Sequence, residues 1–324
     1  MAVRAARGYF ELTRLHKPVM GNTLMFWPCA WGLTMAARAV HLPLPIFSVK
    51  LAVFAVGSCL LHSSACVLND ICDVDFDRQL PLTSRLRPMI AHVERTRDRP
   101  LPAGVVSMRG ASMLCVSLFV PVLGLLSYGD SLSLILGVIG IFPLHALYPF
   151  MKRWTWWPQA WLGLAFNWGV LLTWTSVTGR LPSLPLWVLF FGGVCICAVA
   201  ESRALLAAIS WTIVYDTIYA CQDREDDMRV GVKSTALLFG DYVREVLAVM
   251  VAILVLCLAY AGWALHLGVG YAVLSVGGTL IHSAWQLATW NEADLKDHRA
   301  KFESNGWVGA VIWLGILYDY LSEI

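Results

Sequence analysis

The chain has 324 residues, a length that in a soluble protein would be typical of about two domains. Its composition argues against a soluble protein, because 58% of the residues are hydrophobic and only 14% are charged, whereas soluble domains carry about 25% charged residues. The net charge of +2 is too small to indicate a nucleic-acid partner. Nine Cys residues without a CxxC pair exclude a zinc ribbon and a disulfide framework. The low charge content indicates a surface that faces lipid.

The first 17 residues carry four basic side chains but no separate apolar run, so we expect no cleavable secretory signal. A spanning helix needs about 20 apolar residues, because the hydrocarbon core is about 30 Å thick. Nine runs of that kind follow along the chain, which predicts an all-α, polytopic membrane protein with one domain, residues 1–324. The runs cover residues 19–39, 46–68, 111–128, 131–149, 157–178, 184–215, 243–264, 267–290 and 305–322.

Basic residues are distributed unevenly between the two sides that nine spans define. Twenty of the 24 Lys and Arg residues lie at the N-terminus, or in and beside the loops after the second, fourth, sixth and eighth runs. Positively charged loops remain on the cytosolic or matrix side of a membrane. Because this asymmetry is independent of hydropathy, it supports an odd number of spans with the N-terminus on the positive side.

An acidic cluster follows the second run and reads NDICDVDFD from Asn69 to Asp77. On a helix, Asn69, Asp73 and Asp77 recur every four residues and form one face, and Asp70 lies one turn before Asp73. Like charges stacked in this way repel one another, so the face favours a bound cation. Ionisable side chains at membrane depth are costly and are candidates for function.

A second acidic cluster follows the sixth run and reads DTIYACQDREDD from Asp216 to Asp227. One helical face carries Asp216, Tyr219 and Asp223, with Asp226 or Asp227 at its end. Both clusters lie on the positive side of the predicted topology. A solvated helix end explains one such cluster as well as a site does, but two clusters with this periodicity on one side favour a site.

Carboxylate and amide oxygens are ligands that suit Mg²⁺, which is usually held by a few carboxylates together with substrate phosphates. Two facing clusters would therefore hold Mg²⁺ ions with a diphosphate between them. Arg binds phosphate oxygens through two hydrogen bonds, and Lys acts as a point charge. Basic residues that follow the clusters, and that also set the topology, are Arg95, Arg97, Arg99, Arg229 and Lys233.

The two clusters and their surroundings resemble the UbiA family of intramembrane prenyltransferases. The family signature NDxxDxxxD is met from Asn69 to Asp77, and DxxYAxQDxxDD is met from Asp216 to Asp227. Shorter matches are ERTRxRPL from Glu94 to Leu101, GVKST from Gly231 to Thr235, and KFxSNxxxG from Lys301 to Gly309. The likeness covers nearly the whole chain. Within the family, the chain is similar to 4-hydroxybenzoate polyprenyltransferases and to fungal meroterpenoid enzymes.

The resemblance implies nine helices around a central cavity with capping loops, and Mg²⁺ as the cofactor. It implies transfer of a prenyl group, farnesyl or longer, from an allylic diphosphate to a ring carbon of a phenolic acid such as orsellinic acid or 4-hydroxybenzoate. No protein partner is predicted. The implied metal ligands are Asn69, Asp70, Asp73, Asp77, Asp216, Asp223 and Asp227; the catalytic residues are Asp216, Tyr219 and Asp223; and Arg97 and Lys233 bind the diphosphate. Arg14 and Lys17, at the start of the first span, are candidates to pair with the acceptor's carboxylate, although an anchor at the helix end explains them equally well. Asn22 lies one turn further in and is a candidate contact of the same substrate.

Two other functions are compatible with the residues. A related enzyme would use homogentisate, a naphthoate or haem as the acceptor. A cation or proton transporter also has carboxylates inside the membrane, but it would distribute them along a path through the bilayer, whereas here they gather at one boundary. The weak N-terminal targeting signal favours an ER-like endomembrane over the mitochondrial inner membrane, and specialised meroterpenoid metabolism over ubiquinone synthesis.

Two stretches depart from the family pattern. Residues 79–91 separate the first signature from the ERTR segment, and residues 194–208, with Glu201 and Arg203, separate the sixth apolar run from the second signature. We interpret both as insertions that come from retained introns or from errors in the gene prediction. A spliced transcript that keeps both stretches would refute this interpretation, and the loop over the site would then be remodelled.

Overall fold

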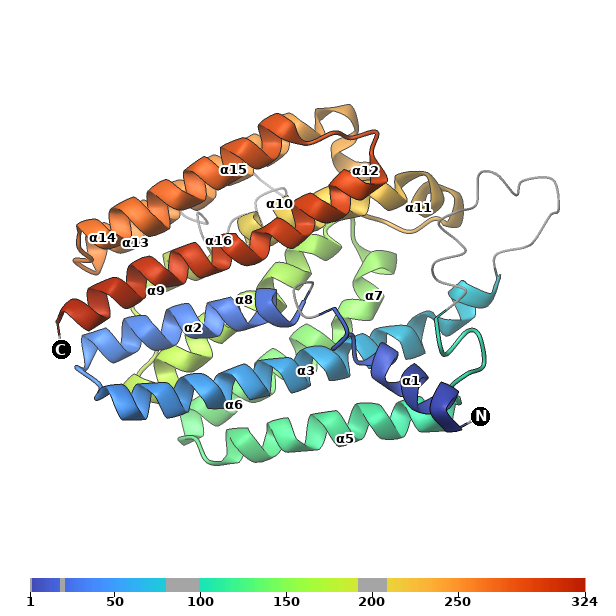
Figure 1. The fold of residues 1–324 in the computed structure, drawn as a ribbon, viewed down its shortest axis with the longest axis horizontal. Helices are drawn as coiled ribbons and strands as arrows, with labels where there is room; N and C mark the ends of the chain where they lie inside the picture. The colour runs from blue at the N-terminus through green and yellow to red at the C-terminus, as the bar shows by residue number, and fades with distance from the viewer. Residues whose placement is uncertain (1, 18–20, 80–98, 192–208, 324) are drawn as a thin grey trace.

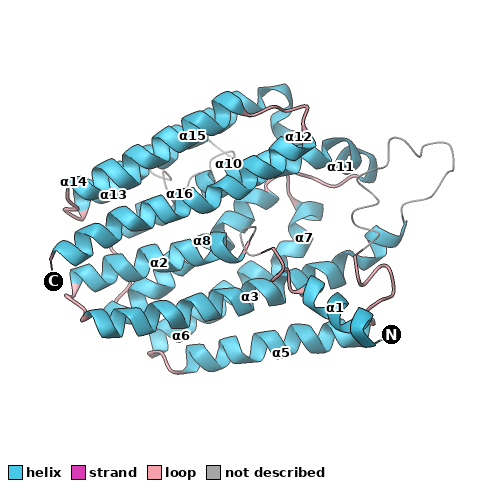
Figure 2. Ribbon diagram, viewed as in Figure 1, coloured by secondary structure: helices cyan, strands magenta, loops and turns pink. Residues whose placement is uncertain are grey.

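A computed structural model describes residues 2–17, 21–79, 99–191 and 209–323. Every regular element within these residues is a helix (Figure 2), as the sequence predicts. Apart from residue 79, the two stretches interpreted as insertions lie outside the described residues.

The helices follow one another in the order of the predicted apolar runs. The first half of the chain contains α1 (Ala2–Leu12), α2 (Asn22–Ala39), α3 (Leu44–Gln79), α5 (Met108–Ser127), α6 (Ser131–Ile139), the π-helical turn η2 (Gly140–His145), α7 (Ala146–Trp154) and α8 (Pro158–Thr178). The second half contains α9 (Leu184–Phe191), α10 (Ile209–Ala220), η4 (Cys221–Asp223), α11 (Arg224–Val230), α12 (Thr235–Phe239), η5 (Gly240–Tyr242), α13 (Val243–Ala264), α14 (Val269–Tyr271), η6 (Ala272–Gly277), α15 (Gly278–Thr289) and α16 (Leu295–Ser322).

The membrane-spanning character of the helices is confirmed in part. Among the described residues, four segments are long and apolar enough to cross a membrane: Leu44–Asp73, Met108–Ser127, Ser131–Trp154 and Thr235–Ala264. The sixth apolar run is described at its ends, by α9 and α10. The number of nine spans therefore stays a prediction.

The long helices lie side by side along the long axis of the molecule (Figure 1). The C-terminal end of α3 lies at the same end of this bundle as α1 and α11, and the C-terminus of the chain lies at the opposite end. Because η4 and α11 follow α10 directly, α10 also ends near α11. The two helices that carry the acidic clusters thus bring them to one end of the bundle.

α2 packs against α3, α8 and α16. Small residues allow its close approach to α8, because a Cβ atom added to Gly32 would collide with the Val170 carbonyl, and one added to Gly169 with the Cys29 sulfur. Small residues at contacts of this kind let membrane helices approach one another closely. An apolar core beside this crossing includes Trp31, Trp211, Tyr215 and Phe302.

The π-helical turn η2 interrupts the span between α6 and α7. Pro143 lies inside this turn and lacks the amide hydrogen that would bond to a carbonyl one turn earlier, so it disfavours a regular α-helix there. The turn ends at His145, whose side chain is 7% exposed. Turns of this type occur frequently at functional sites.

Candidate active site

Asp70 in α3 is almost completely buried, with 2% of its surface exposed, and its carboxylate is paired with two arginines. Arg14 donates from Nη2 to both carboxylate oxygens at 2.9 Å, and Arg99 donates from Nη1 to Oδ1 at 3.1 Å. Charge-assisted, two-pronged contacts of this kind are among the strongest hydrogen bonds in proteins. Both oxygens of Asp70 are therefore engaged by the protein, and Asp70 holds the two arginines together.

Arg14 has an unusual backbone conformation that directs its side chain toward Asp70. Its φ angle is 58°, in the left-handed region that residues other than glycine rarely adopt. Its guanidinium also donates from Nη1 to the carbonyl oxygen of Glu11, in the last turn of α1, at 3.0 Å. The Lys17 amide in turn donates to the Arg14 carbonyl at 2.9 Å. Two of the predicted acceptor-binding residues are thus joined to the first acidic cluster.

A polar cavity of about 160 Å³ lies between the two acidic clusters. Asn69 of the first cluster and Asp216 of the second both line it, as the predicted divided site requires. The cavity is also lined by His62 of α3, by His145 and by Tyr148 of α7. The sequence analysis missed these three residues, although each is a polar side chain within or beside an apolar run.

The second acidic cluster does not lie on one continuous α-helix, contrary to the prediction. α10 ends at Ala220, and the 3₁₀ turn η4 precedes α11. Because a 3₁₀ turn is tighter than an α-helical turn, the four-residue spacing no longer defines one face beyond Tyr219. Asp216 and Asp223 nevertheless lie close enough to interact electrostatically. Burial raises the pKa of the Cys221 thiol between them to about 12, so the thiol does not compete with the carboxylates as an anionic ligand.

Lys152 at the end of α7 is a further candidate residue, which neither sequence signature contains. Its charge interacts favourably with Asp73 of the first cluster and with Asp216 of the second. Its carbonyl accepts a hydrogen bond from the Lys233 amide at 2.9 Å, which places the GVKST segment beside α7. Lys152 ends the fourth apolar run on the predicted positive side, and that position is the sequence signal for its role.

Lys233 and its neighbours form a turn after α11. Gly231 ends that helix with a φ of 74°, a conformation that favours glycine. The Lys233 ammonium lies 5.9 Å from the centre of the Trp156 ring. The turn thus holds a predicted diphosphate-binding cation against the end of the fourth span.

The other predicted site residues are described unevenly. Arg97 and the side chain of Asp77 lie outside the described residues. Asn22 has a buried Oδ1 atom that accepts no hydrogen bond in the described part of the chain. No group of three described His, Cys, Asp or Glu side chains is arranged to hold a metal ion. Asn69 and Asp216 supply oxygen atoms of the kind that suits Mg²⁺, so the cavity is chemically suited to the predicted metal, while the full ligand set stays a prediction.

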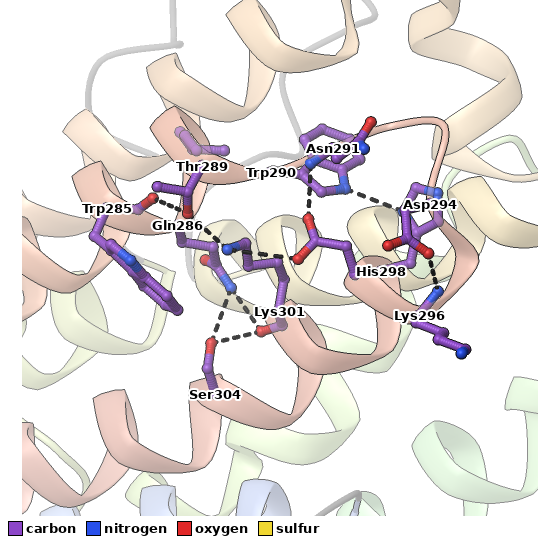
Figure 3. Close-up of polar contacts among 12 residues, drawn as sticks. Trp285, Gln286, Thr289, Trp290, Asn291, Asp294, Lys296, His298, Lys301 and Ser304 are labelled. Atoms are coloured by element: carbon purple, nitrogen blue, oxygen red, sulfur yellow. Dashed lines mark hydrogen bonds and ion pairs between the residues drawn. The ribbon is translucent and has the colours of Figure 1, made fainter.

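A polar network joins α15 to the start of α16 (Figure 3). Lys301 is 5% exposed, donates from Nζ to Thr289 Oγ1 at 2.6 Å, and lies 4.1 Å from the centre of the Trp285 ring. Gln286 donates from Nε2 to the Lys301 carbonyl at 2.7 Å. The face of an aromatic ring attracts a cation in this position. The network therefore fixes the part of α16 that carries the KFxSN motif.

The following residues of α16 connect this network to the cavity. Asn305 accepts a hydrogen bond from Trp211 Nε1 at 3.0 Å. Phe302 lines the polar cavity, and its ring centre lies 4.8 Å from that of Tyr219 and 5.4 Å from that of Tyr215. The KFxSN motif thus positions α10, and Tyr219 forms an aromatic pair at the edge of the site.

A second, largely apolar cavity of about 130 Å³ adjoins the polar one. The two cavities share His145, Ala165 and Phe166. α2, α3, α5, α6 and α8 supply most of its walls. Together the cavities suit a molecule with a charged head and a long apolar tail.

A bundle of apolar helices, a polar cavity flanked by carboxylates and a lysine, and an adjoining apolar cavity define a membrane enzyme that acts on an amphiphilic substrate. The chain belongs to the UbiA prenyltransferase family, whose family model matches residues 25–308. Membership of this family decides between the enzyme and the transporter in favour of the enzyme.

Two relatives show where the chain lies within the family. It is 42% identical over 316 residues to the UbiA prenyltransferase claS of Ampulloclitocybe clavipes, and the match covers 96% of this chain and 90% of the relative. It is 38% identical over 315 residues to the mitochondrial 4-hydroxybenzoate polyprenyltransferase of Arabidopsis thaliana, which covers 96% of this chain and 68% of the relative. The name of the second relative specifies polyprenyl transfer to 4-hydroxybenzoate.

Solved structures show the same fold. The apo structure of a UbiA homologue from Aeropyrum pernix superposes with a TM-score of 0.70 at 22% identity, covering 93% of this chain and 98% of that chain. A UbiA homologue from Archaeoglobus fulgidus bound to DMAPP and Mg²⁺ superposes with a TM-score of 0.61 at 16% identity, covering 98% and 99%. The helical arrangement is therefore that of the family.

Proposed function

We propose that this prenyltransferase moves a prenyl group, farnesyl or longer, from an allylic diphosphate to a ring carbon of a phenolic acid such as 4-hydroxybenzoate or orsellinic acid. The observation that carries the proposal is the polar cavity lined by both Asn69 and Asp216, with an apolar cavity beside it. The name of the Arabidopsis relative supports this class of acceptor.

Mg²⁺ is the proposed cofactor, and the Archaeoglobus homologue bound to DMAPP and Mg²⁺ supports it. When bound, Mg²⁺ would neutralise the charge that develops on the leaving diphosphate. Asp70 belongs to the predicted ligand set, but its contacts support a role in holding Arg14 and Arg99, and its ligation of a metal stays a prediction. The other proposed ligands are Asn69, Asp73, Asp77, Asp216, Asp223 and Asp227.

The chain's own cations would bind the diphosphate oxygens. Lys152 interacts with carboxylates of both clusters, so it lies where a diphosphate between them would need a positive charge. Lys233 is joined to it through the backbone, and Arg97 is the third proposed cation. The role of these side chains is to orient the diphosphate and to stabilise it as the carbon–oxygen bond breaks.

The acceptor would enter beside the N-terminal end of α2. Gly21 lines the polar cavity, and the next residue, Asn22, has the unpartnered Oδ1 atom. The acceptor's carboxylate would be bound by Arg14 and Lys17, and Asn22 would contact the same substrate. These contacts would hold the ring with its nucleophilic carbon toward the allylic carbon.

The aromatic wall of the cavity suits the cationic chemistry. The Phe302 ring lines the cavity and the Tyr219 ring packs against it, and these rings would stabilise the allylic cation through their π electrons. Asp216 or a water molecule would accept the ring proton. The prenyl tail would occupy the apolar cavity, in a protein whose nine helices cross an endomembrane with the acidic clusters on the cytosolic side.

The proposal is tested in microsomes that contain the expressed chain, with Mg²⁺, farnesyl and longer diphosphates, and either 4-hydroxybenzoate or orsellinic acid. We expect a prenylated phenolic acid whose formation stops when EDTA removes the metal. The Asp223→Ala variant should lose about two orders of magnitude in rate if its carboxylate holds the Mg²⁺ that stabilises the leaving diphosphate. Product formation that survives both EDTA and Asp223→Ala would refute the proposed site.

A further inference from the structure

His145 is a buried polar residue in the wall that the two cavities share. Its side chain is 7% exposed, and it lines both the polar and the apolar cavity. Its ring stacks on Phe166, with ring centres 6.3 Å apart and an angle of 19° between the planes. It therefore lies at the junction where the head and the tail of an amphiphilic substrate would meet.

The hydrogen bond at one ring nitrogen fixes what the other nitrogen can do. Nδ1 lies 2.7 Å from the Gly140 carbonyl oxygen, which can only accept, so Nδ1 carries the hydrogen. A charged imidazolium at this depth would be a buried cation, which is costly, so the ring is neutral and Nε2 presents a lone pair. Nε2 is buried and has no hydrogen-bond partner in the described part of the chain.

His62 provides a comparison within the same cavity. It is 8% exposed, lines the polar cavity, and meets the edge of the same Phe166 ring at 6.1 Å. Its ring nitrogens lie 3.6 and 3.9 Å from the Cys66 sulfur, so it has a partner within α3. A buried acceptor without a hydrogen-bond partner is costly. Of these two histidines, it is His145 that has such an acceptor in the described part of the chain, so a ligand that donates a hydrogen bond to it would remove that cost.

We propose that His145 Nε2 accepts a hydrogen bond from a ring hydroxyl group of the aromatic acceptor. The proposal rests on the proposed function, because it assigns one contact of that substrate. A carboxylate has no hydrogen to donate and would repel the lone pair, so the hydroxyl end of a phenolic acid is the end that fits. Phe166 lies beside the same position and can contact the substrate ring.

The contact would help the reaction as well as binding. When the ring carbon attacks the allylic carbon, positive charge spreads to the hydroxyl oxygen, and its O–H becomes a stronger donor. The hydrogen bond to His145 therefore strengthens in the transition state, which is the condition for raising kcat. No proton has to leave the oxygen for this effect.

Two substitutions separate this role from a structural one. The amide nitrogen of His145→Asn lies near the Nδ1 position and keeps a donor for Gly140, but it removes the acceptor at Nε2. The amide oxygen of His145→Gln reaches the Nε2 position and keeps an acceptor there. We expect His145→Asn to lower kcat/KM for the phenolic acid by about 10- to 100-fold, as for a hydrogen bond that gains charge, with an unchanged KM for farnesyl diphosphate, and His145→Gln to retain most of the activity.

A structural role would give the opposite order, with His145→Asn tolerated better than His145→Gln, and that result would overturn the proposal. Turnover of 4-methoxybenzoate, which has no ring hydroxyl to donate, should be equal in wild type and His145→Asn; a similar loss with this acceptor would also overturn it. His282→Gln is the control, because His282 lines neither cavity, and its activity should be unchanged. Wild-type membranes that prenylate neither 4-hydroxybenzoate nor orsellinic acid would refute the proposed function and this contact together.

Discussion

Asp70 of α3 and Asp216 of α10 each provide the first carboxylate of a signature, yet the two face different surroundings. Asp70 is 2% exposed, and both of its oxygens accept hydrogen bonds from arginines. Asp216 lines the polar cavity together with Asn69 and interacts with Lys152 and Asp223. The comparison indicates that the carboxylates of these motifs have two kinds of surroundings, since Asp70 holds two arginines in place and Asp216 faces the cavity.

The largest effect is expected from substitutions that test this difference directly. Asp216→Asn should lower kcat by about 10²- to 10³-fold, because it removes a proposed ligand of the Mg²⁺ that would stabilise the leaving diphosphate, and it should raise the Mg²⁺ concentration needed for half-maximal rate. Asp70→Asn should shift the Mg²⁺ dependence less, because both Asp70 oxygens already accept hydrogen bonds from arginines. Initial rates across a Mg²⁺ titration measure kcat and the Mg²⁺ concentration for half-maximal rate in each variant. An equal shift of the Mg²⁺ dependence in the two variants would contradict the difference between Asp70 and Asp216.

A smaller effect concerns the stability that Asp70 contributes through Arg14. Asp70→Asn and Arg14→Gln should each lower the free energy of unfolding by about 2 kcal/mol, since each leaves a charged partner partly buried, and Arg14 is 23% exposed. The double variant should lose less than the sum, with a coupling of about 1 kcal/mol or more. Thermal unfolding of the purified protein in detergent provides the measurement, and additive effects would show that the pair contributes little.

The smallest effect is expected at the network between α15 and α16, which belongs to neither cluster. Lys301→Met keeps an apolar stem but removes the charge over Trp285, and it should lower the free energy of unfolding by about 1 kcal/mol. The Mg²⁺ dependence should not change. The matched control is Lys296→Met, because Lys296 is an exposed lysine on the same helix. If Lys301→Met lowers the rate of prenyl transfer by more than its loss of folded protein explains, the network contributes to the active site.

The sequence predicts the convergence of the two clusters because the motifs fix both their spacing and their side of the membrane. Asn69 and Asp216 then line one cavity, although they lie on helices far apart in the chain. The pairing of Asp70 with Arg14 is not predictable from local pattern, because a contact across 56 positions depends on how α1 and α3 pack and on the backbone of Arg14.

Other features of the site depend on tertiary packing in the same way. The helical spacing predicts a continuous face through Asp223, but the spacing alone does not reveal that the α-helix gives way to the 3₁₀ turn η4. His145 lies in a run read as an apolar span and Lys152 lies just after it, and their surroundings depend on what α3, α8 and α10 place beside them. The stretches interpreted as insertions lie almost wholly outside the described residues, so that interpretation stays a prediction.

The π-helical turn η2 has a consequence for how this site can vary between related sequences. Because the turn contains one residue more than an α-helical turn, it absorbs that residue locally and leaves the relative directions of α6 and α7 nearly unchanged. Deletion of Pro143, which also removes the residue that disfavours a regular helix, would therefore leave Tyr148 and Lys152 with nearly the same direction relative to α6. The segment can thus differ by one residue between related sequences without a change in which residues of α7 face the cavity.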